Sequence, residues 1–193
     1  MIEIEKKFII NNKVKDLLED AHYIKTDIIN DTYYDDTHYS LTSKDWWLRL
    51  RNGIFELKVP LSIAKNDAMD RYEELVDDRL RQKLSLSSNF SLNAAISSAG
   101  YVPFATIIST RKVYKLDEFT VVIDSMNYGY ETGEIELLVA NEDQEDNASK
   151  KILALAQKYE LSISRFRGKV FEYLWRFNPT HYDALLQAGV VKV

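Results

Sequence analysis

The stretch Ile2-Glu3-Ile4-Glu5-Lys6-Lys7-Phe8 decides the fold, because charged and apolar side chains alternate along it. Glu3, Glu5 and Lys7 fall on one side of an extended chain and the apolar residues fall on the other, with Lys6 as the exception. Successive side chains of a β-strand point to opposite faces of its sheet. A period of two therefore predicts a strand with one charged face and one apolar face.

The same alternation returns in later segments of the chain. Charged residues alternate with apolar ones over 46–51, 55–59 and 134–137, and more weakly over 119–124. Segments 24–35, 71–76 and 104–116 also read as strands, the last from its many β-branched and aromatic residues. Asn52-Gly53 lies between two alternating runs and predicts a tight hairpin.

Amphipathic helices are expected between the strands. We expect one helix from Asn11/Asn12 to about Ala21 and further helices at 89–99 and 147–160, the last capped by Asn147. A final helix begins with Asn178 as its cap and Pro179 as its first residue, and ends at Gly189. The sequence therefore predicts a single α+β domain over residues 1–193 that is mostly β. About eight antiparallel strands would close into a barrel, with helices packed outside on the apolar faces and the charges inside.

Composition excludes several classes of protein. The 193 residues carry a formal net charge of −5, which is the wrong sign for coating duplex nucleic acid. Cysteine is absent, so disulfides, thiolate metal sites and a cysteine nucleophile are excluded. The first residues are too charged for a signal peptide, and no stretch approaches the length of a membrane span. We therefore expect a cytoplasmic protein without a membrane or nucleic-acid partner.

Charges inside a barrel point to a charged ligand, because burying them without one would be costly. Lys7, Arg49, Arg51 and Lys58 supply donors that suit phosphate oxygens. The four glutamates on predicted inner faces supply hard oxygen ligands for Mg²⁺ or Mn²⁺; they are Glu3, Glu5, Glu134 and Glu136. Cations, carboxylates and a divalent metal together describe a polyphosphate site. No Walker motif or kinase glycine loop is present to hold the phosphates through the backbone.

An ordered set of motifs covers nearly the whole chain. It consists of Glu3-x-Glu5-x-Lys7, Asp31-Thr32-Tyr33-Tyr34-Asp35, Trp47-Leu48-Arg49-Leu50-Arg51, Glu56-Leu57-Lys58-x-Pro60, Tyr72-x-Glu74-Leu75, Gly129-Tyr130-x-x-Gly133-Glu134-x-Glu136 and Lys169…Arg176-Phe177-x-Pro179-x-x-Tyr182. In order and spacing the set resembles the CYTH, or triphosphate tunnel metalloenzyme, superfamily, and within it the thiamine triphosphatase branch.

This resemblance implies a closed tunnel of eight antiparallel strands and metal-dependent hydrolysis of a triphosphate. By family match the metal ligands would be Glu3, Glu5, Glu134, Glu136 and Asp124. The branch tends to carry an Asp-x-Asp pair before the Gly-Tyr motif, and here the first position of that pair is Val122. Phosphate oxygens would be held by Lys7, Arg49, Arg51, Arg111 and Lys169.

Three further positions match residues that act on the substrate in the branch. Tyr33 and Lys58 match a catalytic dyad, and Trp47 matches an aromatic residue that stacks on the organic part of the substrate. We expect neighbouring cations to lower the pKa of Lys58, so that it takes a proton from water directly or through Tyr33. Glu74 is expected to line the tunnel, although alternation alone would equally allow Glu73.

The favoured reading is a Mg²⁺-dependent hydrolase, with Mn²⁺ as the alternative metal, that converts thiamine triphosphate to thiamine diphosphate and phosphate. Hydrolysis of inorganic tripolyphosphate is the alternative, since Trp47 alone suggests an organic group. An adenylate cyclase of the same superfamily is a third reading, but no adenine-binding signature supports it. A non-catalytic polyphosphate-binding module would keep the cations and lose the metal or the base. We expect a monomer whose partner is a small-molecule triphosphate.

Overall fold

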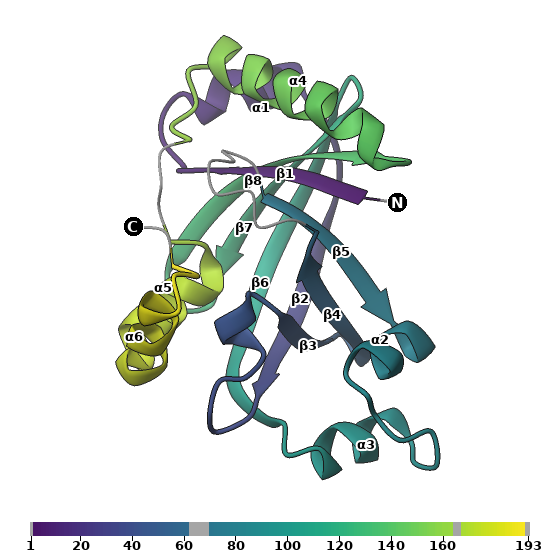
Figure 1. The fold of residues 1–193 in the computed structure, drawn as a ribbon. Coiled ribbons are helices and arrows are strands. Elements are labelled where there is room, and N and C mark those ends of the chain that lie inside the picture. The colour runs from purple at the N-terminus through teal and green to yellow at the C-terminus, as the bar shows by residue number, and fades with distance from the viewer. Residues whose placement is uncertain (1, 62–69, 164–166, 192–193) are drawn as a thin grey trace.

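The computed structural model describes residues 2–61, 70–163 and 167–191, and within these ranges eight antiparallel strands close into a barrel (Figure 1). The strands in chain order are β1 (Ile2–Phe8), β2 (His22–Asp35), β3 (Trp47–Arg51), β4 (Ile54–Pro60), β5 (Asp70–Val76), β6 (Val102–Leu116), β7 (Phe119–Met126) and β8 (Tyr130–Val139). Around the barrel their order is β1-β5-β4-β3-β2-β6-β7-β8, and β8 pairs back with β1. The closed barrel expected from alternation is confirmed, with strand ends that differ by a few residues.

Six α-helices accompany these strands in the described ranges. They are α1 (Val14–Asp20), α2 (Asp77–Lys83), α3 (Leu92–Ser98), α4 (Glu145–Lys158), α5 (Lys169–Phe177) and α6 (Pro179–Gln187), with short 3₁₀ turns η1 (Thr42–Lys44) and η2 (Glu142–Gln144). The predicted cap of α6 is confirmed, since the Asn178 side chain accepts a hydrogen bond from the His181 amide. The predicted cap of α4 is wrong: that helix begins at Glu145, and Asn147 lies inside its first turn.

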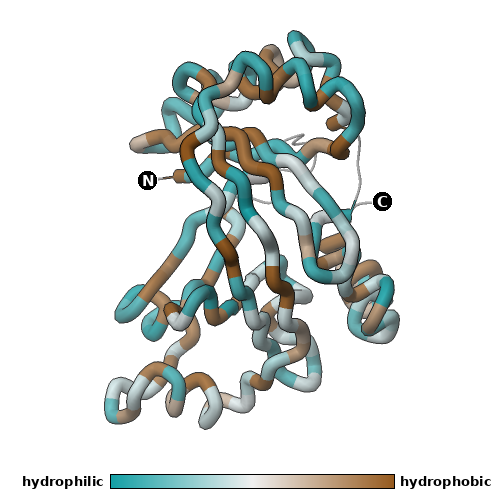
Figure 2. The backbone as a smooth tube through the Cα atoms, turned by 180° about the vertical axis from the view of Figure 1, so that it is seen from behind, coloured by the Kyte–Doolittle hydropathy of each residue, from teal (hydrophilic) through white to brown (hydrophobic). Residues whose placement is uncertain are grey.

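Helices cover two separate apolar faces on the outside of the barrel. Above the barrel in Figure 1, α1 and α4 lie over β1, and Leu17 and Ile152 join a buried cluster that includes Ile4, Phe8 and Ile135. At the other end, Leu80 of α2 and Ile96 of α3 pack on the outer face of β3, β4 and β5 in a second cluster. Figure 2 shows both apolar and polar residues along the strands of the barrel.

The C-terminal helices α5 and α6 pack differently. Leu174 of α5 and Leu185 of α6 belong to a third cluster together with Tyr33, Trp47 and other residues of the inner barrel face. The start of α5 therefore approaches the interior of the barrel, whereas α1 to α4 cover its outside. The described residues include no helix long and apolar enough to cross a membrane.

Gly133 of the Gly-Tyr motif permits a close approach across the seam between β1 and β8. It pairs with Phe8 across the β1–β8 contact, and Phe8 is fully buried. A Cβ atom on Gly133 would lie 2.1 Å from the Phe8 ring, which is far below van der Waals contact. Glycine is therefore required at this position so that β8 can pack beside Phe8.

Candidate active site

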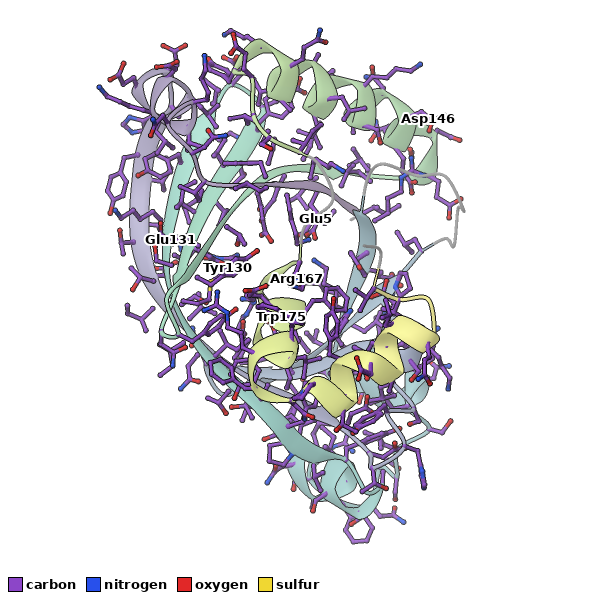
Figure 3. All side chains as sticks on the ribbon, turned by 90° about the vertical axis from the view of Figure 1, so that its left-hand side faces the viewer. Glu5, Tyr130, Glu131, Asp146, Arg167 and Trp175 are labelled. Atoms are coloured by element: carbon purple, nitrogen blue, oxygen red, sulfur yellow. The ribbon has the colours of Figure 1, made fainter. Side chains whose placement is uncertain are left out.

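A pocket lies in the interior of the barrel. Its lining residues come from seven strands, all but β7, and from the start of α5; they are Glu3, Glu5, Lys7, Tyr33, Trp47, Arg49, Arg51, Lys58, Tyr72, Glu74, Arg111, Glu134, Glu136, Gly168, Lys169, Val170 and Phe171. Glu5 lies within the ring of strands in Figure 3, whereas Glu131 and Asp146 lie on its outside. Every residue that the sequence predicted for the site lines this pocket except Asp124.

The strand register explains why these side chains meet. Glu5 pairs with Glu136 across β1 and β8, and Lys7 pairs with Glu134 on the same seam. Directly paired residues of an antiparallel sheet point to the same face, so each inner-facing residue brings its partner with it. On the opposite wall Arg49 pairs with Tyr33 of β2 and with Glu56 of β4. Charged side chains from neighbouring strands are therefore brought together inside the barrel.

Carboxylates gather on the β1–β8 side of the pocket. Burial is the main cause that raises the pKa of Glu3 to about 7. Burial and the neighbouring charges of Glu134 and Glu3 raise the pKa of Glu136 to about 8. Burial would also raise the pKa of Glu5, but ion pairs with Lys58 and Lys7 offset it and lower that pKa well below its usual value. Negative charge on this side therefore exceeds what the two lysines neutralise.

Lys58 lies between two of these carboxylates. Its Nζ atom donates to Glu3 at 3.0 Å and to Glu5 at 2.7 Å, and it lies 4.6 Å from the centre of the Tyr72 ring. Burial favours the neutral amine, but Glu5 and Glu3 offset it and raise the pKa of Lys58 above its usual value. The expectation that cations would lower this pKa is wrong, because the nearest charges are carboxylates. Lys58 is held here as an ammonium group.

Guanidinium and ammonium groups line the opposite wall, and each is held by a carboxylate. Arg49 donates to Glu56 at 2.8 Å and to Glu74 at 2.8 Å. Arg51 forms a bidentate pair with Asp31 at 2.7 and 2.9 Å. Fixed partners hold these planar groups in one orientation before any ligand arrives, and planar guanidinium groups match phosphate oxygens.

Asp31 is a residue of the site that the sequence reasoning missed. It is fully buried and accepts hydrogen bonds from Arg51, from Lys169 at 2.8 Å and from the Tyr33 hydroxyl at 3.4 Å. Burial would raise its pKa, but the Arg51 hydrogen bonds and the Lys169 charge lower it. Alternation in the quoted Asp31-Thr32-Tyr33 run puts Asp31 on the face of Tyr33, and that signal was sufficient to find it.

Asp124 forms an ion pair with the guanidinium group of Arg111. The residue is 1% exposed, and its two carboxylate oxygens accept hydrogen bonds from Arg111 at 2.8 and 2.6 Å. It is not among the residues that line the pocket, and its carboxylate orients Arg111. Its role as a metal ligand stays a prediction. Val122, the departure from the Asp-x-Asp pattern, is buried two residues earlier and pairs with Glu134.

Aromatic rings form one section of the pocket wall. Trp47 meets Phe171 of α5 edge to face, with ring centres 5.2 Å apart, and Tyr33 at 6.5 Å. Asp45 fixes two of the rings, since it accepts from the Trp47 indole at 2.7 Å and from the Tyr72 hydroxyl at 3.0 Å. Tyr33 and Lys58, predicted as a dyad, both line the pocket, but their hydrogen bonds go to different partners.

The donor set fits a hard divalent cation, although no ready cluster of three or more His, Asp or Glu ligands occurs among residues 2–61, 70–163 and 167–191. Glu3, Glu5, Glu134 and Glu136 present carboxylate oxygens, the ligands that Mg²⁺ and Mn²⁺ prefer. The raised pKa values of Glu3 and Glu136 also reflect crowded negative charge that a cation would relieve. The residues present therefore suit such a metal.

Comparisons with known proteins identify a family and several proteins of similar fold. The CYTH domain matches residues 1–165. Human thiamine-triphosphatase is 27% identical to the chain, over 98% of this chain and 91% of the human protein. Among solved structures, the PH1819 protein of Pyrococcus horikoshii superimposes with a TM-score of 0.69 at 19% identity, covering 90% of this chain and 99% of that one. A Hippeastrum protein described as having a dominant triphosphatase activity superimposes with a TM-score of 0.56 at 16% identity, covering 90% of this chain and 95% of that one. At these identities the solved structures show likeness of fold alone.

Proposed function

This chain belongs to the CYTH domain family, and from that premise we propose that it hydrolyses the terminal phosphoanhydride bond of a triphosphate, most favourably thiamine triphosphate. The observation that carries the proposal is the interior of the barrel, where Arg49, Arg51 and Lys169 face the carboxylates of β1 and β8 across one pocket. The likeness to human thiamine-triphosphatase over almost the whole chain supports the choice of substrate.

Phosphoryl transfer needs positioning and neutralisation of charge more than covalent help. Arg49, Arg51, Arg111, Lys7 and Lys169 would bind the phosphate oxygens. The carboxylates that hold these cations keep them oriented, so little reorganisation is needed when charge develops. Water would attack the terminal phosphorus, and the bridging P–O bond would break to release phosphate and a diphosphate.

A divalent metal, Mg²⁺ or Mn²⁺, would be held by Glu3, Glu5, Glu134 and Glu136 and would neutralise charge on the phosphates. Tyr33 and Lys58 are the candidates for proton transfer, because both line the pocket; Lys58, held as an ammonium group, would give a proton to a reacting oxygen. Trp47 and Phe171 would contact the organic part of the substrate.

Inorganic tripolyphosphate is the second candidate substrate, because the cations of the pocket recognise phosphate whatever is attached to it. The deciding experiment is a turnover assay with thiamine triphosphate, tripolyphosphate and ATP, each with Mg²⁺ and with Mn²⁺. Thiamine triphosphate should give the highest kcat/KM, with phosphate as a product. Pyrophosphate release from ATP would instead indicate cyclase chemistry, and binding without turnover of any of the three would indicate a binding module.

Replacing Arg49 or Arg51 by alanine should lower kcat/KM by about 30- to 1,000-fold, equivalent to about 2–4 kcal/mol of transition-state stabilisation. Each variant loses a guanidinium group that is already oriented toward the pocket by a carboxylate. Steady-state kinetics measures the effect, and Arg79→Ala is the matched control because Arg79 lies exposed on α2. Near-normal turnover in both pocket variants would contradict the assignment.

Replacing Trp47 by alanine should weaken hydrolysis of thiamine triphosphate severalfold and leave tripolyphosphate hydrolysis nearly unchanged. Aromatic stacking contributes about 0.5–1.5 kcal/mol beyond area burial, and only the thiamine substrate offers a ring. The readout is the ratio of kcat/KM for the two substrates. Trp46→Ala is the control, since Trp46 packs in the outer cluster of β3, β4 and β5. An equal loss on both substrates would mean that Trp47 only supports the wall.

A further inference from the structure

The turn between β7 and β8 brings two tyrosines side by side. Gly129 has a φ of +76°, a left-handed conformation that glycine adopts without strain, and it separates Tyr128 from Tyr130. The two rings stack with centres 6.2 Å apart and an interplanar angle of 13°. Gly129 and Tyr130 begin the Gly-Tyr motif, and the proposed chemistry assigns no role to these two residues.

Both tyrosine hydroxyls bind the main chain at the start of α5. Tyr128 donates to the carbonyl oxygen of Lys169 at 2.6 Å, and Tyr130 donates to that of Arg167 at 2.5 Å. Figure 3 shows Tyr130 and Arg167 next to one another at the edge of the barrel. Burial raises the pKa of both tyrosines, so each hydroxyl keeps the proton that it donates. Bonds to carbonyl groups fix the backbone itself, whichever side chains it carries.

The far end of α5 returns to the same turn. Arg176 donates to the carbonyl oxygen of Tyr128 at 3.2 Å, and its guanidinium carbon lies 5.6 and 5.7 Å from the centres of the two stacked rings. Glu172, which is 5% exposed, accepts from Arg176 at 2.9 Å and from Arg167 at 2.6 Å. The β7–β8 connection therefore contacts α5 at both the beginning and the end of the helix.

Lys169 is the pocket cation that depends on this attachment. It is the first residue of α5. Its Nζ atom donates a hydrogen bond to the Asp31 carboxylate of β2 at 2.8 Å. The other pocket cations lie on strands of the barrel, where the sheet hydrogen bonds fix their backbones. Lys169 has no sheet partner, and its own carbonyl group is the acceptor of the Tyr128 hydroxyl.

We propose that Tyr128 and Tyr130 are positioning residues that hold the start of α5 and so keep Lys169 directed into the pocket. The inference rests on the proposed function only in taking Lys169 as a phosphate ligand. When the hydroxyls are lost, α5 occupies its binding position for a smaller fraction of the time. The apparent affinity for phosphate then falls by that fraction.

The test measures binding of tripolyphosphate by calorimetry in Tyr128→Phe, Tyr130→Phe and the double variant. Each single change should raise Kd by about two- to tenfold, the range set by loss of one hydrogen bond, and the double change should raise it further. Tyr173→Phe is the matched control. Its ring contacts Tyr128 in the same cluster, but its hydroxyl is not one of the two that hold the α5 backbone. Its Kd should equal that of the unaltered protein.

A double-mutant cycle with Lys169→Met separates positioning from a general structural role. If the tyrosines act through Lys169, their replacement in the Lys169→Met background leaves Kd unchanged, although it still lowers Tm. The same rise in Kd in both backgrounds, or no rise in the double tyrosine variant, would overturn the inference. The cycle measures binding and not hydrolysis. If the protein bound tripolyphosphate without hydrolysing it, the proposed function would be refuted, and the cycle would still test the positioning role of the two tyrosines.

Discussion

Excess chelator is expected to reduce triphosphate hydrolysis to the uncatalysed rate, and added Mg²⁺ or Mn²⁺ should restore it. The physical reason is the crowding of Glu3, Glu5, Glu134 and Glu136 on one side of the pocket, where Lys58 and Lys7 neutralise only part of the negative charge. A triphosphate adds more negative charge to the same space, so without a dication the carboxylates should repel the substrate. Initial rates at fixed substrate and increasing chelator measure the effect.

A variant of one carboxylate connects this loss to the pocket. Glu5→Gln should shift the Mg²⁺ dependence to higher metal concentration, because Glu5 is 2% exposed and lies at the centre of the acidic side. Glu131→Gln is the matched control, since Glu131 is exposed on the outer face of β8 and bonds to Ser125. Full hydrolysis in excess chelator would exclude metal dependence. An equal shift of the Mg²⁺ dependence in both variants would show that the pocket carboxylates do not bind the metal.

Lys58→Ala is expected to lower kcat by about 10²- to 10⁴-fold on thiamine triphosphate and on tripolyphosphate alike, the range for loss of a proton-transferring group. Both substrates should respond equally, because Lys58 contacts the carboxylates of Glu3 and Glu5 and both substrates carry the same terminal phosphoanhydride bond. Kinetics on the two substrates gives the comparison. The alanine variant also leaves Glu3 and Glu5 without their shared cation, so its Tm must be recorded.

Lys58→Arg distinguishes proton transfer from charge. Arginine keeps the positive charge beside Glu3 and Glu5 but stays protonated at any working pH. If Lys58 transfers a proton, this variant should fold like the parent protein and still lose most of its activity on both substrates. Parent-like rates would show that Lys58 serves as a fixed charge, and the proton-transfer role would have to be abandoned.

The barrel could be predicted from the sequence because its signal is local and repeated. Several strands alternate charged residues on the inner face with apolar residues on the outer face. This period of two can be recognised in one strand without knowing which strand lies beside it. Two helices escaped prediction. Among the seven residues of α2 only Leu80 is buried, so the sequence shows no helical repeat of apolar residues. The residues of α5 were interpreted as part of a motif of charged and aromatic residues and not as a helix. The end of an element depends on contacts that the local pattern does not contain.

The membership of the pocket was predictable, whereas its electrostatics were not. Lys7, Arg49 and Glu136 follow from alternation and motif spacing. The state of Lys58 depends on Glu3 and Glu5, which precede it by more than fifty residues and meet it only when the barrel closes. Phe171 was missed for a related reason, since it reaches the pocket from a helix whose placement is set by the Tyr128–Tyr130 turn.

The position of β1 in the barrel has a consequence for biosynthesis. This strand leaves the ribosome well before both of its neighbours, since Glu3 pairs with Tyr72 on one side and with Leu138 on the other. At roughly 5–20 residues per second, β1 waits on the order of ten seconds before β8 exists to receive it. Its carboxylates thus cannot meet Glu134 and Glu136 until the last seam forms. The repulsive acidic side of the pocket therefore forms only after β8 has been made, when the outer cluster of β3, β4 and β5 under α2 and α3 is already available to offset it.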